Sequence, residues 1–173
     1  RTIVRTTNKG LSASVIEGIT SARGDVVCVM DADMSHPPEL IGKLYKKLEE
    51  GYDMAVGSRL IGDGGVEEWP VHRRFMSFVG RMLALPLTPV KDTMSGYFMF
   101  RKEILKGFAL VPRGYKILLE ILVKGHVKNV TEVPYIFRNR ELGQSKISQT
   151  IIREYLQQII DLYWFRTKTI FKK

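Results

Sequence analysis

Two aspartates, Asp31 and Asp33, have the types and spacing best suited to chemistry, because they follow an apolar run of strand length at 26–30. Residues two apart on an extended chain point the same way, so both carboxylates can face one cleft at the rim of a sheet. Ser35 supplies another oxygen on that side. Such oxygens suit a hard divalent cation, Mg²⁺ or Mn²⁺, held against a phosphorylated ligand. The alternative is a pair of loop aspartates that form turns or cap the next helix.

Three histidines lie in the chain, and none is assigned a catalytic role. His36 follows the aspartate pair, where a capping or surface histidine is expected rather than a metal ligand. His72 and His126 are expected to be surface or structural residues.

Five residues form a second candidate group: Arg59, Arg73, Ser77, Arg140 and Lys146. Arg59 follows a predicted strand over 53–57, beside the aspartate pair. Arg73 and Ser77 are spaced i, i+4 and therefore share one face of a helix. Arg140 and Lys146 lie on a basic, glycine-containing loop over 138–146. Guanidinium groups match the geometry of phosphate oxygens, but each residue taken alone is equally a solvated surface charge.

Strands and helices alternate along the chain, which is typical of an α/β fold. Apolar periodicity, prolines and glycines predict strands over 2–5, 26–30, 53–57, 97–100 and 130–137, and helices over 12–22, 37–50, 70–85, 103–106 and 115–124, followed by a long amphipathic helix. The first strand, the first helix and the strand over 26–30 would form a parallel βαβ unit. That second strand is apolar throughout, which predicts a central position. The 70–85 helix and the closing helix are expected to form a small layer beside the sheet.

A net charge of +9 over 173 residues predicts anionic partners such as nucleic acid, phosphorylated substrates or an acidic membrane surface. The length suits one domain. The single cysteine, Cys28, cannot form an internal disulfide, which favours a reducing compartment. No uncharged apolar run approaches the ~18 residues of a membrane span. The chain opens at Arg1 in strand-like sequence without an initiator Met, which predicts a fragment.

Five motifs occur in order along the chain: Gly-Asp-Val-Val-Cys-Val-Met-Asp-Ala-Asp-Met-Ser-His-Pro-Pro at 24–38, Val-Gly-Ser-Arg at 56–59, Trp-Pro at 69–70 with Arg73 and Ser77, Asp-Thr-Met-Ser-Gly at 92–96, and Gly-Gln-Ser-Lys at 143–146. Together they resemble the inverting family-2 glycosyltransferases of GT-A fold, and within these the dolichol-phosphate mannose synthases, which are polyprenyl-phosphate mannosyltransferases. The Trp-Pro segment with its Arg and Ser favours mannosyl transfer over other reactions of the family.

The resemblance implies a GT-A, Rossmann-like mixed sheet flanked by helices, here lacking its N-terminal βαβ part and the segment that holds the nucleoside. It implies that Asp33 binds the metal, with Ser35 as a further ligand through water. Asp31 would orient the donor, and the backbone of Ala32 would lie against the nucleotide. Asp31 and Asp33, together with Arg59, are the implied catalytic residues.

The implied ligands of the acceptor phosphate are Arg59, Arg73 and Ser77. Arg140 and Lys146 would lie on a mobile loop that closes over the donor phosphates and the acceptor, and with Arg59 they would bind the donor.

The implied reaction is inverting transfer of mannose from GDP-mannose to dolichyl or another polyprenyl phosphate, giving dolichyl phosphate β-mannose, a donor for protein glycosylation. The implied cofactor is Mg²⁺ or Mn²⁺. A phosphate monoester is largely dianionic near neutral pH, so it attacks the sugar carbon without a general base. The protein must instead offset repulsion between two anions and stabilise the departing nucleoside diphosphate.

Two parts are expected: a catalytic domain over 1–150 and an amphipathic helix over 151–173. The last turns mix Tyr163, Trp164 and Phe165 with cations, which is typical of a membrane-interface helix, although a core-packing helix with a basic tail is an equal alternative. With a lipid acceptor, the expected location is the cytoplasmic face of a membrane: the ER membrane in a eukaryote, or the plasma membrane in a prokaryote. A membrane-anchoring subunit is a further expected partner.

Three alternatives remain open from the sequence. One is a polyprenyl-phosphate glucosyl- or N-acetylhexosaminyltransferase that releases UDP instead of GDP. Another is a nucleic-acid-binding module; the charge alone suggests it, the chain lacks a recognisable RNA- or DNA-binding motif, and no nucleic-acid partner is expected. The third is an inactive fragment that acts as a scaffold.

Overall fold

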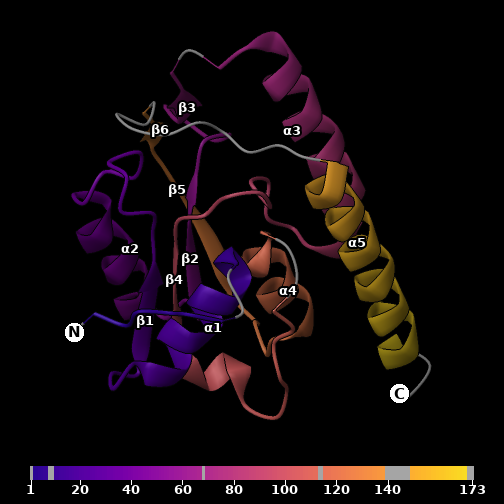
Figure 1. Cartoon of the computed structure of the whole chain (residues 1–173). Coiled ribbons are helices and arrows are strands. Elements are labelled where there is room, and N and C mark those ends of the chain that lie inside the picture. Colours follow the sequence, from indigo (N-terminus) through magenta and orange to yellow (C-terminus); the bar gives the residue numbers. More distant parts are fainter. Residues whose placement is uncertain (1, 8–9, 68, 113–114, 139–148, 171–173) are drawn as a thin grey trace.

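The computed structural model describes residues 2–7, 10–67, 69–112, 115–138 and 149–170 (Figure 1). Its elements in chain order are α1 (Leu11–Ser21), β1 (Val26–Val29), α2 (Leu40–Glu49), β2 (Met54–Ser58), β3 (Gly65–Val66), α3 (Val71–Ala84), the 3₁₀ helix η1 (Leu85–Leu87), β4 (Phe98–Arg101), the 3₁₀ helix η2 (Lys102–Leu105), α4 (Ile117–Lys124), β5 (Val130–Pro134), β6 (Ile136–Phe137) and α5 (Gln149–Ile170).

A four-stranded sheet in the order β1-β4-β2-β5 forms the centre of the fold. β4 runs antiparallel to β1 and β2, whereas β2 and β5 run parallel. Phe98 at the start of β4 pairs with Val29 of β1 and with Val56 of β2. The chain therefore leaves β1 and β2, and enters β4, at one edge of the sheet. That edge carries the predicted aspartates and Arg59.

Side chains alternate along the strands, so the sheet is covered on both faces. One face, which includes Val27, Met54 and Phe98, packs with α1 and α4. The other, which includes Ala55 and Met99, packs with the leucine stripe of α2. Figure 1 shows α2 on one side of the sheet and α1 and α4 on the other. The α/β class and the mixed sheet flanked by helices are confirmed.

The predicted strand over 2–5 is wrong. These residues form no strand; Arg5 instead pairs with Glu17 of α1 at 3.0 Å and donates to the Ser14 hydroxyl at 3.4 Å. The parallel βαβ unit is therefore absent from the described ranges, where β1 is an edge strand with β4 as its neighbour. The apolar run of β1 reflects side chains that pack on both faces of the sheet, and this pattern does not report how many strands flank it.

The predicted strand over 130–137 divides into two, because the chain changes partners at Tyr135. The Tyr135 N–H donates to the Ser58 carbonyl at 3.0 Å, and its carbonyl accepts from Gly65 N–H at 3.1 Å. β5 before it pairs with β2, and β6 after it pairs with β3 in a separate two-stranded sheet. This small sheet brings Phe137 to the same edge as the site residues.

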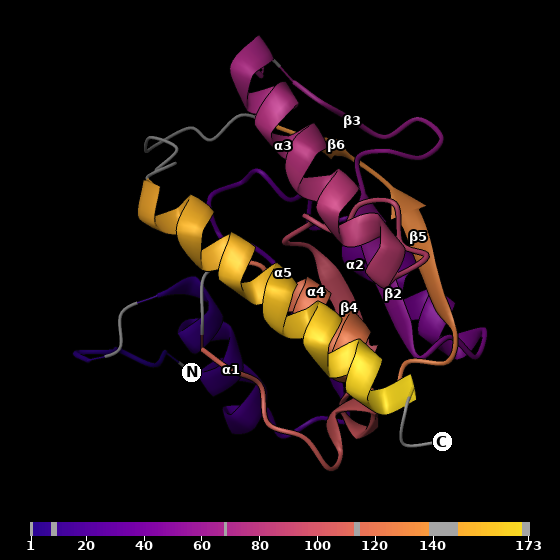
Figure 2. The ribbon, with the colours of Figure 1, turned by 90° about the vertical axis from the view of Figure 1, so that its right-hand side faces the viewer.

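α3 and α5 lie side by side next to the sheet, as predicted (Figure 2). The hydroxyl of Tyr155 donates to the Gly80 carbonyl at 2.6 Å, and that of Tyr163 to the Leu83 carbonyl at 3.1 Å. Ile159 and Leu162 of α5 pack into a core shared with α3 and α4. Across the described ranges, no helix combines the length and the apolar character needed to cross a membrane.

Candidate active site

The aspartate pair lies on a tight turn that follows β1. Asp33 Oδ1 accepts hydrogen bonds from Ser35, from the backbone N–H at 3.1 Å and from the hydroxyl at 2.5 Å. Met34 between them has a φ of 63°, the left-handed conformation that such a turn requires. Asp31 and Asp33 are partly buried, whereas Ala32 and Met34 are exposed. This alternation agrees with two carboxylates that point to one side.

His36 is buried against the aspartate turn and binds its backbone. It is 2% exposed, and its Nδ1 accepts the Asp31 backbone N–H at 2.8 Å. This bond stabilises the turn and caps no helix, since the N-cap of α2 is Glu39, with no side-chain cap. A surface position is also wrong, because the imidazole packs with the ring of Tyr97 at a centroid distance of 4.9 Å. A Cβ on Gly96 would lie 3.3 Å from His36 Cε1 and 3.8 Å from Asp31 Oδ2. The loop that precedes β4 thus lies directly against the aspartate turn.

The aspartate turn fits a divalent cation only as a partial ligand set. Within the described part of the chain, no three His, Cys, Asp or Glu side chains converge as a metal cluster. The two carboxylates are hard oxygen donors suited to Mg²⁺ or Mn²⁺, which often take their remaining ligands from phosphate and water. The fully buried Ser35 hydroxyl is directed to Asp33, so its observed contact orients the carboxylate.

Arg59 is held in a two-pronged ion pair with Asp92, a residue that sequence reasoning gave no role. Nε donates to Asp92 Oδ2 at 2.8 Å and Nη2 to Oδ1 at 2.7 Å, with side chains 9% and 1% exposed. Burial favours the neutral carboxyl, but the hydrogen bonds and charge of Arg59 outweigh it and hold the pKa of Asp92 below its usual range. Among the residues that the structure describes, Arg59 Nη1 has no hydrogen-bond partner. This nitrogen, the open edge of the guanidinium group, can therefore donate to a ligand.

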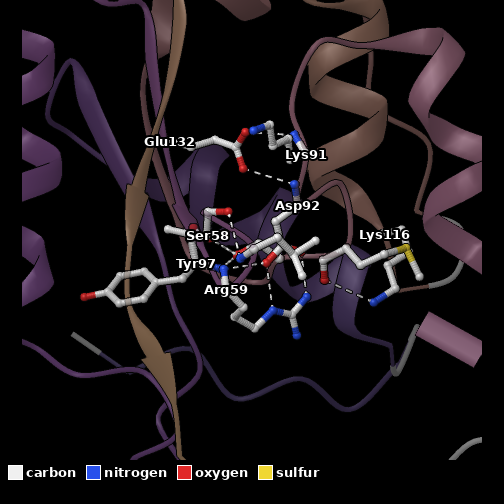
Figure 3. Close-up of polar contacts among 11 residues, drawn as sticks. Ser58, Arg59, Lys91, Asp92, Tyr97, Lys116 and Glu132 are labelled. Carbon is white, nitrogen blue, oxygen red and sulfur yellow. Dashed lines mark hydrogen bonds and ion pairs between the residues drawn. The ribbon is translucent and has the colours of Figure 1, made fainter. Parts of the chain in front are cut away.

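Glu132 of β5 fixes the loop that carries Asp92. Its carboxylate accepts the backbone N–H of Lys91 at 2.8 Å and of Asp92 at 3.0 Å (Figure 3). Ser95 of the same loop donates through its hydroxyl to the Gly57 carbonyl at 2.6 Å. The motif at 92–96 was visible in the sequence, but only these contacts give it a function: it positions Arg59.

Trp69 brings the predicted basic residues together. The guanidinium carbon of Arg73 lies 3.9 Å from the centroid of its indole ring, and that of Arg59 lies 5.2 Å away. Phe137 lies within 6.0 Å of both guanidinium carbons. Ser77 is partly buried one turn after Arg73 on α3, as the i, i+4 spacing predicts. Arg140 and Lys146 lie outside the described residues.

Lys116 is a further cation that sequence reasoning missed. It precedes α4, and its ammonium donates to the Met94 carbonyl at 3.3 Å. Burial, and secondarily the positive charge of Arg59, lower its pKa to about 8. It also interacts electrostatically with three other site residues, Asp31, Arg73 and Asp92, so these charges share one region. No local pattern in the sequence distinguishes Lys116 from a surface lysine.

The pattern of the family described as Glycosyl transferase family 2 matches residues 1–108. Curated relatives named dolichol-phosphate mannosyltransferase come from Pyrococcus furiosus (46% identical), Mycosarcoma maydis (40%) and Saccharomyces cerevisiae (39%). The matches cover 94%, 98% and 96% of this chain, in the same order. The chain spans 47%, 60% and 65% of the lengths of these relatives.

Solved structures of glucosyl-3-phosphoglycerate synthase from Mycobacterium tuberculosis share the fold. One of them, in complex with Mn²⁺, UDP-glucose and phosphoglyceric acid, has a TM-score of 0.63 at 19% identity over 95% of this chain and 56% of that chain. Another, with the same TM-score, contains Mg²⁺ and UDP. At this identity the likeness concerns the fold alone. Because the family pattern covers more than half of its residues, the chain belongs to Glycosyl transferase family 2, and its fold is of the GT-A type.

Proposed function

We propose that this chain transfers mannose, with inversion, from GDP-mannose to dolichyl or another polyprenyl phosphate. The relatives named dolichol-phosphate mannosyltransferase support the acceptor and the sugar. The structural observation that supports the proposal is that a pair of aspartates and a pair of arginines lie at the same end of the sheet, where β1 and β2 end. The carboxylates of Asp31 and Asp33 follow β1, and the guanidinium groups of Arg59 and Arg73 meet over Trp69.

The carboxylate half of the site, which comprises Asp31, Asp33 and Ser35, is proposed to bind the donor. Asp33 would hold Mg²⁺ or Mn²⁺, Ser35 would orient Asp33 or bind the ion through water, and Asp31 with the backbone of Ala32 would face the nucleotide. When bound, such an ion neutralises charge on the departing diphosphate. Arg140 and Lys146 are proposed to contribute to donor binding from the loop over 138–146. Complexes of the neighbouring fold with Mn²⁺ or Mg²⁺ and a uridine nucleotide support a divalent cofactor.

The basic half of the site, which comprises Arg59, Arg73 and Ser77, is proposed to bind the acceptor phosphate. The open edge of Arg59, with Arg73 and Ser77 on one face of α3, offers donors from two different elements. Because Asp92 and Trp69 already fix the guanidinium groups, little reorganisation remains when a phosphate arrives. The acceptor oxygen carries its own negative charge, so the residues only position it and offset repulsion.

The protein is proposed to act at the cytoplasmic face of a membrane. The surface proposed to contact the membrane is the layer that α3 and α5 form. Both helices expose large apolar side chains: Val71, Phe75, Met76, Phe78, Val79, Met82 and Leu83 on α3, and Ile152, Leu156, Ile160, Tyr163, Trp164 and Phe165 on α5. Cations lie beside the exposed aromatic rings, as Lys168 does over Trp164 at 5.0 Å. Such a surface suits the interface of an anionic bilayer, where a lipid acceptor resides, and it also suits a membrane-anchoring subunit.

The test is a transfer assay on the full-length protein with a polyprenyl phosphate and Mg²⁺ or Mn²⁺, comparing GDP-mannose with UDP-glucose and UDP-N-acetylglucosamine. The expected result is mannosyl-phosphate lipid and GDP, abolished by EDTA. Turnover with a UDP-sugar alone would replace mannose by another sugar. No turnover with any donor would favour the inactive scaffold.

A further inference from the structure

We propose that Lys116 is a further phosphate ligand of this site, in which its ammonium group acts as a third cation beside Arg59 and Arg73. The identity of the phosphate, on the acceptor or on the donor, rests on the proposed function. The binding role itself rests on the geometry around the ammonium.

The ammonium group of Lys116 has unused hydrogen-bonding capacity. It carries three N–H donors and no acceptor. Met94 O accepts one bond, at the long distance of 3.3 Å, and the described residues supply no other partner. A partly buried ammonium with unused donors is costly unless a ligand or water completes its shell. A phosphate oxygen is an acceptor of the matching charge.

The fold fixes the backbone of Lys116, and the contact with Met94 O directs its ammonium. Lys116 directly precedes α4, whose residues Ile117 to Ile121 are all buried. Its carbonyl accepts a hydrogen bond from Gln158 Nε2 of α5 at 3.1 Å, and Gln158 itself is 5% exposed. With its side chain partly buried and its ammonium bonded to the Met94 carbonyl, Lys116 loses less rotamer freedom on binding than a surface lysine.

The same contacts place the ammonium next to the predicted acceptor site. Met94, whose carbonyl it binds, packs under α3: a Cβ on Gly80 would lie 3.1 Å from Met94 Cε. Gly80 follows Ser77 by three residues and so lies on the helix face of Arg73 and Ser77. Figure 3 places Lys116 beside the Arg59–Asp92 pair.

The local charge balance favours an added anion. Lys116 interacts electrostatically with two like charges, Arg59 and Arg73, and with two opposite charges, Asp92 and Asp31. Asp92 already gives both of its oxygens to Arg59. Burial and the arginines lower the pKa of Lys116 to about 8, and an incoming phosphate would raise it again. Phosphate binding should therefore be accompanied by proton uptake near this pH.

The test measures binding to the full-length protein by calorimetry with two probes, farnesyl monophosphate for the acceptor and GDP with Mg²⁺ for the donor. In Lys116→Met, affinity for at least one probe is expected to fall about tenfold or more, the scale of a hydrogen bond to a charged group. Lys116→Arg should recover part of the affinity. Lys102→Met is the matched control, because the ammonium of Lys102 also donates to a backbone carbonyl, that of Ala22 at 2.8 Å, but at the opposite end of β4.

The two arms distinguish the source of the phosphate. A loss confined to farnesyl monophosphate assigns Lys116 to the acceptor, a loss confined to GDP assigns it to the donor, and unchanged affinity in both arms overturns the inference. Wild-type binding near pH 8 should take up a proton that Lys116→Met does not, a difference that a purely structural lysine would not produce. Thermal unfolding checks that the variant folds, and Lys116→Gln, which keeps a donor at this position, provides a second neutral variant.

The result also separates this inference from the proposed reaction. A wild-type protein that binds the probes through Lys116 but transfers no mannose would overturn the reaction and leave the phosphate ligand standing. A wild-type protein that binds neither probe would overturn both.

Discussion

Asp33 and Arg59 are both held by short hydrogen bonds, but their partners differ in charge. Ser35, which is neutral, donates two hydrogen bonds to Asp33 and orients its carboxylate without offsetting its negative charge. The partner of Arg59 is Asp92, an anion, so the guanidinium is fixed in orientation while its charge is largely balanced. We therefore expect Asp33 to act through its charge and Arg59 chiefly through the direction of its open edge.

Asp33→Asn is expected to remove metal-dependent turnover, because the amide keeps the shape of the side chain and loses its charge. Ser35→Ala should weaken activation by Mn²⁺ about tenfold, the usual scale for a group that orients a ligand. Titrating transfer activity with Mn²⁺ measures both effects. Asp63→Asn, an exposed carboxylate outside the site, is the control. Normal turnover by Asp33→Asn would remove this residue from the metal site.

Lys116 should make the free energy of unfolding increase with pH in the alkaline range, which is opposite to the effect of Cys28. Its pKa is about 8 in the folded state. An unfolded lysine has a pKa near ~10.4, so between these values the unfolded chain binds more protons and stability rises with pH. Cys28, with its pKa raised to about 11 by burial, opposes this rise above its ordinary value of 9.0.

Urea unfolding of the wild type and of Lys116→Met across this pH range isolates the contribution of Lys116. The difference in the free energy of unfolding, wild type minus variant, should increase with pH. A flat difference would show that Lys116 keeps an ordinary pKa in the folded protein.

The loop over 91–96 is the element that connects the two halves of the site. Asp92 pairs with Arg59, Met94 accepts from Lys116, and Gly96 lies against the aspartate turn. Glu132 of β5 and the Gly57 carbonyl of β2 hold the loop in place. Two strands of the sheet thus hold the loop that orients the basic residues, although none of those residues lies on a regular strand.

Asp92→Asn is expected to destabilise the fold by about 3–5 kcal/mol, the usual cost of leaving one member of a buried ion pair uncompensated. Its pKa is lowered in the folded state, so the stabilising effect is present above the ordinary carboxyl pKa and is lost as pH falls through the folded value. Urea unfolding near neutral pH measures the loss. Glu50→Gln breaks the exposed pair with Lys47 and should change little. A variant as stable as the wild type would mean that Asp92 does not hold Arg59 in solution.

On the scale of the whole molecule, the helices that surround the sheet differ in the surfaces that they expose. α2 covers one face and exposes Ile41 and Tyr45 among charged residues, while α3 and α5 form a layer whose outer side carries many large apolar residues. Ile160 and Trp164 of α5 are 66% and 64% exposed, although Ile159 and Leu162 of the same helix are buried. The helix therefore packs into the core and also presents an apolar surface, so the two sequence alternatives for it are compatible.

Trp164→Glu is expected to weaken binding of the full-length protein to vesicles containing phosphatidylserine by about tenfold, because a charge replaces an aromatic ring suited to the interface. Co-sedimentation at low and high salt measures the change. Tyr45→Glu on α2 is the control, since Tyr45 is 47% exposed on the opposite side of the sheet. Equal binding by both variants would exclude the α3–α5 layer as the lipid-binding surface.

The sequence alone determined those parts of the site that depend on neighbours in the chain. An apolar run followed by Asp31 and Asp33 predicts carboxylates at the end of a strand, and the helical repeat places Arg73 and Ser77 on one face. Both follow from the periodicity of local backbone structure, which the order of residues encodes directly. The α/β class follows in the same way from alternating strands and helices.

Only the tertiary structure decided which distant residues meet. Arg59 and Asp92 are 33 positions apart, and Glu132 lies 40 positions beyond Asp92. Their contacts depend on β4 inserting antiparallel between β1 and β2, and on β5 pairing with β2. Local patterns record which side of an element is buried, but not which element covers it. For that reason the edge position of β1 was mispredicted, and Lys116 became visible as a site residue only once the strands were assembled.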